Sequence, residues 1–63
     1  MRQTLRVMAP EAAIRVEPQA RAQVVTTLRT GATVEVIGEE PGWYHVVLAD
    51  GTMGWMEQSV FRR

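Results

Sequence analysis

Turn-forming residues interrupt this chain so often that no long element fits between them. They are Pro10, Pro18, Gly31 and the pairs Pro41-Gly42 and Asp50-Gly51, spaced about 8 to 12 residues apart. The runs between them are rich in Val, Ile, Thr and Leu, and some alternate apolar with polar residues. Short β-rich runs divided by Gly, Pro and Asp are typical of a small β-sandwich or barrel. We therefore expect an all-β fold.

The clearest strand is Ala32–Gly38, where Val34 and Val36 alternate with Thr33, Glu35 and Ile37 and should face the core. The other expected strands are Thr4–Met8, Ala13–Glu17, Gln23–Leu28, Trp43–Leu48 and Thr52–Met56. We expect one helical turn in Gln19–Gln23, a turn at Glu39–Gly42 and a 3₁₀ turn in Glu57–Phe61. The expected core consists of Val7, Ile14, Val24, Leu28, Val34, Val36, Val46, Met56 and Phe61.

The length of the chain limits how these strands pack. Five or six short strands in 63 residues are too few for two full sheets, so one bent sheet closed on itself is the economical solution. The chain has no cysteine and one histidine, His45, which excludes a disulfide framework, a zinc finger and a cysteine nucleophile. The core must therefore stabilise the fold alone or with a partner's surface.

Charge and hydropathy exclude further classes. Seven arginines balance seven acidic residues, so no strong field attracts nucleic acid or an anionic membrane. No apolar run approaches the roughly 20 residues of a membrane span. The segment Met1–Met8 lacks an apolar stretch, and we expect no signal peptide in it. Four arginines lie near the two termini, and they form either one basic patch or an ordinary solvated surface: Arg2, Arg6, Arg62 and Arg63.

A series of residues follows a characteristic order along the chain. It consists of Ile14, Arg15, Pro18, Val24-Val25, Leu28, Gly31, Val34, Val36, Gly42-Trp43-Tyr44, Val46, Asp50-Gly51 and Gly54-Trp55-Met56. This set, with two Gly-Trp pairs flanking an Asp-Gly turn, resembles the bacterial SH3-like domain (SH3b) family from about Thr4 to Phe61. The chain departs from the family pattern at Ala13, where Asn is usual, and at Glu17, where Gly is usual.

The resemblance implies a small SH3-like β-barrel of five to six short strands, with residues 1–63 as a single domain whose core covers about 4–61. It implies a non-catalytic binding or targeting module that recognises a protein, a peptide or a cell-wall (peptidoglycan) fragment. With one histidine and no cysteine, we expect no metal site, and we expect no cofactor. A structural or homo-oligomeric barrel is the alternative, through Val25, Ile37 and Val47 on the outward face. A nucleic-acid-binding barrel is a third reading, disfavoured by the zero net charge.

Four residues are candidates for ligand binding: Trp43, Tyr44, Trp55 and Arg15. The aromatic residues would form a shallow groove for a peptide or a sugar, or else cover the barrel ends. Arg15 matches a recurrent family arginine, which would bond carbonyl groups or an acid such as Asp50 or Glu17, with direct ligand contact as a lesser role.

The hairpin at Asp50-Gly51 decides where Trp55 points. A strict two-residue type I′ turn, with positive φ at both central residues, would pair Val46 with Trp55 and turn Trp55 inward. The family pattern places Met56 in the core, which a bulge at Gly54 would allow. We favour the bulge.

Catalytic groups are scarce. Pairing across the turn at Pro41-Gly42 predicts Glu35 opposite His45 as an outward polar pair without a nucleophile. Glu39 and Glu40 are neighbours in the expected turn and do not face each other across a cleft. We therefore expect no enzymatic activity.

Overall fold

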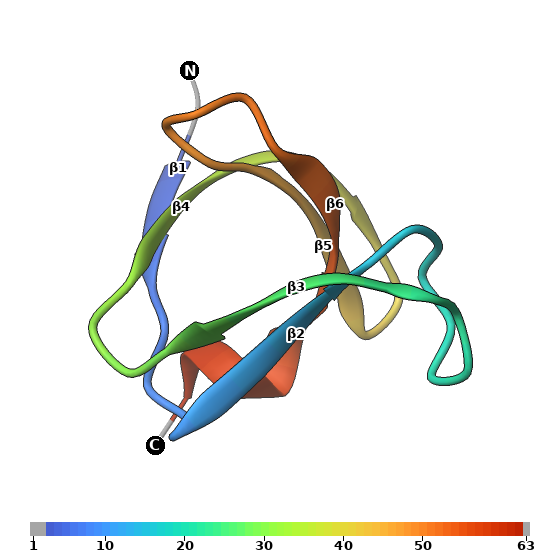
Figure 1. Ribbon diagram of the computed structural model, residues 1–63, viewed down its shortest axis with the longest axis horizontal. Helices are drawn as coiled ribbons and strands as arrows, with labels where there is room; N and C mark the ends of the chain where they lie inside the picture. The colour runs from blue at the N-terminus through green and yellow to red at the C-terminus, as the bar shows by residue number, and fades with distance from the viewer. Residues whose placement is uncertain (1–2, 63) are drawn as a thin grey trace.

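A computed structural model describes residues 3–62 of the chain. The strands are β1 (Gln3–Arg6), β2 (Glu11–Arg15), β3 (Val24–Arg29), β4 (Thr33–Glu40), β5 (Trp43–Val47) and β6 (Met53–Glu57), followed by a 3₁₀ helix, η1 (Gln58–Phe61). The strands form one antiparallel sheet in the order β1-β4-β5-β6-β2-β3. Figure 1 shows this sheet curled into a ring. The expected all-β, SH3-like barrel is confirmed.

Backbone hydrogen bonds outside the strand ladders hold the ring together. The Val7 N–H donates to the Ala32 oxygen and the Gly31 N–H donates to the Val7 oxygen, both at 2.8 Å. The Val60 oxygen of η1 accepts from Met8 at 2.8 Å and from Ala9 at 3.1 Å. The segment after β1 is therefore tied both to the β3–β4 turn and to η1.

Six apolar side chains form the buried core: Val7, Ala12, Ile14, Val34, Val46 and Met56. Leu28, Val36 and Phe61 are partly buried against it, so most of the expected core is confirmed. Val24 was placed in this core wrongly, since it is 42% exposed. The β2–β3 register shifts at Ile14/Arg15 and sets Val24 opposite Arg15, which neighbours the buried Ile14 and so faces outward.

The β4–β5 register differs from the expected one. Strand β4 continues to Glu40, which pairs with Trp43, so the turn consists of Pro41 and Gly42 alone. A register shift between Val36 and Gly38 then leaves Ile37 as an extra residue. As a result Glu35 lies opposite Val47 and His45 lies opposite Gly38. The predicted Glu35–His45 pair is therefore wrong.

The β5–β6 hairpin has a longer loop than the expected type I′ turn. The Leu48 N–H donates to the Thr52 oxygen and the Gly51 N–H donates to the Leu48 oxygen, which leaves a three-residue loop. Gly51 has φ of 94°, and no non-glycine residue in 3–62 has positive φ, so Asp50 does not adopt the type I′ conformation. A three-residue loop ending in a left-handed residue is the next common hairpin connection.

This loop sets the register of β6 without the bulge that we favoured. Val46 lies opposite Gly54 and Tyr44 opposite Met56, with no shift in the ladder. Met56 is fully buried and Trp55 is partly exposed, as we expected. The additional turn residue, rather than a bulge at Gly54, produces this arrangement.

The boundaries of other elements differ from the predicted ones by a few residues. Strand β2 begins at Glu11 and ends at Arg15, two residues earlier than predicted. Residues 19–23 contain bends and a turn rather than the expected helical turn. The 3₁₀ helix is present as η1. Arg2 and Arg63, two members of the predicted terminal basic patch, lie outside the described residues. No helix in residues 3–62 is long and apolar enough to span a membrane.

Candidate functional site

Two aromatic rings stack on the outer face of β5 and β6. His45 alternates with the buried Val46 along β5, so its side chain lies on the outer face of the sheet. Trp55 is its partner on β6. The two ring centroids are 4.5 Å apart and the ring planes differ by 5°. The two rings cover each other's facing sides, and since both residues are partly exposed, the rest of the stack is accessible to solvent.

Arg15 lies on the other side of Trp55. It pairs with Trp55 across β2 and β6, so Arg15, Trp55 and His45 form one row across three strands. The Arg15 guanidinium donates a 2.7 Å hydrogen bond to the Ala22 oxygen. This bond to a carbonyl group fits the structural role expected for Arg15, since it holds the loop between β2 and β3 beside the stacked rings.

Trp43 shares the outer face, two residues before His45 on β5. It lies opposite Glu40 on one side and Glu57 on the other. Gln58 fixes this end of the strand: its side-chain nitrogen donates to the Trp43 oxygen and to Glu39 Oε2, each at 3.2 Å. We refer to Trp43, His45, Trp55 and Arg15 as the aromatic face.

Tyr44 points the other way. It packs against the core, and its ring lies 5.8 Å from that of Phe61, tilted by 59°. The structure therefore brings together three of the four candidate residues, Trp43, Trp55 and Arg15, and places Tyr44 on the opposite side of β5.

The sequence analysis did not reveal two features of this site. The His45–Trp55 stack depends on the β5–β6 register, for which we had expected a two-residue turn with a bulge at Gly54. Gly54 allows β6 to approach β2 closely: a Cβ atom there would lie 2.4 Å from Ile14 Cγ2 and 2.7 Å from the Arg15 oxygen. The Gly54-Trp55 pair, which matches the family pattern, was the sequence signal that could have indicated this close approach.

Residues 3–62 contain no group of three or more His, Cys, Asp or Glu side chains that could hold a metal ion. The pKa of Asp50 lies below its ordinary value because the Thr52 backbone N–H, 2.9 Å from Oδ1, and the Thr52 hydroxyl hydrogen-bond to the carboxylate. Asp50 lies in the β5–β6 loop and not on the aromatic face.

Comparison with known proteins identifies the family. A sequence model described as the bacterial SH3 domain matches residues 10–61. The chain belongs to the bacterial SH3 domain family. The match covers β2 to η1, and so includes every strand that contributes to the aromatic face. No curated protein sequence matches the chain significantly.

A solved structure shows the same fold. NlpC2 from Trichomonas vaginalis superposes on this bacterial SH3 domain with a TM-score of 0.85 and 14% sequence identity. The alignment covers 100% of this chain and 23% of the NlpC2 chain. At this identity the likeness supports the fold alone.

Proposed function

We propose that this bacterial SH3 domain is a non-catalytic targeting module that binds a peptide, a protein or a cell-wall fragment through its aromatic face. The family is one of binding and targeting modules. The observation that carries the proposal is the position of Trp43, His45 and Trp55, three partly exposed aromatic residues on one side of two adjacent strands.

The chemistry of the face suits an extended or flat ligand. The parts of the stacked His45 and Trp55 rings that stay exposed offer apolar area against which a peptide or a sugar ring would pack. Glu40 and Glu57 flank Trp43 and would orient polar groups of the ligand. One indole in a desolvated contact contributes about 2 kcal/mol or more to binding, so Trp43 and Trp55 would dominate the affinity.

Retention on purified peptidoglycan tests the proposal. The wild-type domain, Trp43→Ala and Trp55→Ala are mixed with insoluble peptidoglycan and the bound fraction is measured after sedimentation. Val25→Ala is the control, because Val25 is an exposed apolar residue on β3, 44% accessible to solvent and outside the aromatic face. We expect Val25→Ala to bind like the wild type and both tryptophan variants to bind at least about tenfold more weakly. Equal retention of all four proteins would contradict the proposal.

A homo-oligomeric barrel is the second candidate, and one observation favours it. Strand β3 is an edge of the sheet, and Val24 and Val25 at its start are 42% and 44% exposed. Edge strands with exposed apolar residues are surfaces for pairing with another chain. Sedimentation equilibrium distinguishes the two candidates: a concentration-dependent dimer that Val25→Glu abolishes supports oligomerisation, and a monomer at every concentration excludes it.

A further inference from the structure

Two carboxylates flank Trp43 on the outer side of the sheet. Glu40 of β4 lies directly opposite Trp43, and Glu57 of β6 lies opposite it on the other side. Directly opposed residues of an antiparallel ladder point to the same face, with Cβ atoms about 4.5–5.5 Å apart. The three side chains therefore form one row, in which a partly exposed indole lies between two exposed carboxyl groups.

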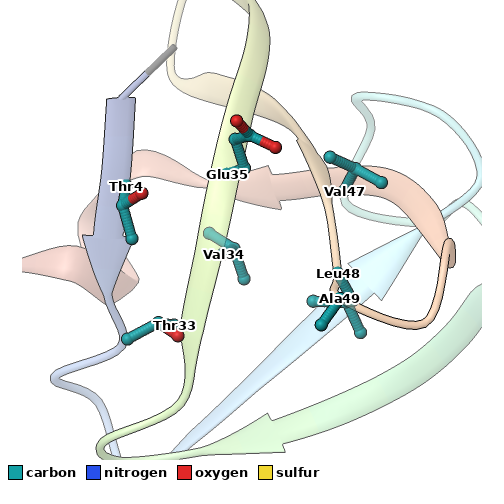
Figure 2. Close-up of a pocket in the computed structure, with 7 residues that line it drawn as sticks. All are labelled: Thr4, Thr33, Val34, Glu35, Val47, Leu48 and Ala49. Atoms are coloured by element: carbon teal, nitrogen blue, oxygen red, sulfur yellow. The ribbon is translucent and has the colours of Figure 1, made fainter.

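Both carboxylates of this row are open to a ligand. Within residues 3–62, neither Glu40 nor Glu57 has a hydrogen bond or an ion pair at its carboxylate. The other two glutamates of β4 differ in this respect. Glu39 accepts a hydrogen bond from Gln58. Glu35 lines a separate pocket between β1, β4 and the segment after β5 (Figure 2), and it already interacts with another group.

The other end of the aromatic face carries the opposite charge. Trp55 lies between His45 on β5 and Arg15 on β2, and the imidazole ring covers one side of the indole. Since Trp43 and His45 are two residues apart on β5, the two rows are about 7 Å apart. A cation at Trp55 would meet the Arg15 guanidinium, whereas a cation at Trp43 would meet two carboxylates.

An indole between two carboxylates suits a particular ligand chemistry. The face of an indole attracts ammonium and guanidinium groups, and a carboxylate on each side adds Coulombic attraction. Lysine and arginine side chains carry such a cationic head on an apolar stem, so one side chain would use both the ring and the charges.

We propose that Trp43, Glu40 and Glu57 bind a cationic side chain of a peptide. The proposal rests on the proposed function, because it specifies the charge of the ligand that the aromatic face binds. It also gives the bound peptide a direction: the cationic side chain lies at Trp43, and a neutral or anionic part extends toward Trp55 and Arg15.

An NMR titration tests the proposal. The probes are N-acetyl-lysine amide and N-acetyl-arginine amide, with N-acetyl-norleucine amide as the uncharged analogue of similar stem. We expect both cations to shift the indole N–H signal of Trp43 saturably and more than that of Trp55, and norleucine amide to bind about fivefold or more weakly. Equal affinity for charged and uncharged probes, larger shifts at Trp55, or no saturable shift would each overturn the proposal.

Two double variants test the role of the carboxylates. Glu40→Gln/Glu57→Gln should weaken binding of the cationic probes about threefold or more and leave norleucine amide unchanged. Glu11→Gln/Glu17→Gln is the control, since it removes the same two charges at exposed positions outside the row, and it should bind all probes like the wild type. Cation binding unaltered by the first double variant would refute the proposal.

These outcomes are distinct from those of the proposed function. Retention on peptidoglycan that requires Trp43, together with equal affinity for the lysine and norleucine probes, would support the binding function and overturn the cation site. Selective binding of the cationic probes, with equal retention of the wild type and the tryptophan variants, would support the cation site and contradict binding to peptidoglycan.

Discussion

At the scale of single residues, glycine and tryptophan act together in β6. Gly54 has an ordinary strand conformation, so its backbone does not require glycine. Glycine is needed because Ile14 and the Arg15 backbone occupy the space that a side chain would fill. The close approach of β6 to β2 brings Trp55 beside Arg15. The sequence indicated that this Gly-Trp pair matters, but the contacts that explain it join segments some forty residues apart, which no local pattern predicts.

Gly54→Ala should destabilise the domain. Its Cβ would lie 2.4 Å from Ile14 Cγ2 and 2.7 Å from the Arg15 oxygen, so the strands must move apart, at a cost of about 1–3 kcal/mol. Urea unfolding measures the change in free energy. Gly38→Ala is the matched control, since its Cβ would meet only the His45 side chain, whose nearest atom is Cβ at 3.3 Å. Equal stability of the two variants would contradict the packing described here.

Val46→Ala should also destabilise the domain. Val46 is fully buried beside Val34 and Met56, so the truncation removes apolar contacts and leaves a cavity, at a cost of about 1–3 kcal/mol. The same urea experiment measures it. A loss below about 0.5 kcal/mol, as at a typical surface position, would mean that Val46 does not belong to the core.

At the scale of elements, strands were easier to predict than registers. Alternating residues identified β4, and its buried Val34 is confirmed. The register of β4 with β5 failed because it depends on an extra residue at Ile37 and on a two-residue turn. The sequence does not display either feature. The His45–Trp55 stack, which is the part of the candidate site that sequence reasoning missed, depends on the β5–β6 register, and the three-residue loop sets that register.

Asp50 should make the β5–β6 loop sensitive to acid. Hydrogen bonds from Thr52 hold the pKa of Asp50 below its ordinary value of 3.8, so the folded state favours the charged carboxylate. Its contribution to stability is therefore present above pH 3.8 and lost as the pH falls through the lowered pKa. Asp50→Ala should be less stable than the wild type at neutral pH, and the difference should shrink below pH 3.8. Thermal unfolding from pH 2 to pH 7 measures it; a difference independent of pH would contradict this role.

At the scale of the whole molecule, closure of the sheet takes the place of covalent crosslinks. The described chain is nearly isotropic, with extents of 26 × 24 × 23 Å, and its segments are tied by the Val7 and Val60 hydrogen bonds. The sequence predicted this architecture because turn residues and short alternating runs leave a small chain few other solutions. Alternation along β5 alone puts Trp43 on the outer face and Tyr44 on the side of the buried Val46, and Tyr44 packs on Phe61. The sequence did not show that Trp55 meets His45, since that follows from the β5–β6 register.

The central claim is that the aromatic face serves binding rather than folding, and the melting temperature of Trp43→Ala, read beside its retention on peptidoglycan, tests it most directly. We predict that retention is lost while the melting temperature falls by less than about 8 °C, which corresponds to roughly 1 kcal/mol in a domain of this size. If Trp43 instead acted as a lid on the core, its truncation would cost about 3–5 kcal/mol. A fall in melting temperature above about 12 °C, with binding lost only as the domain unfolds, would contradict the account.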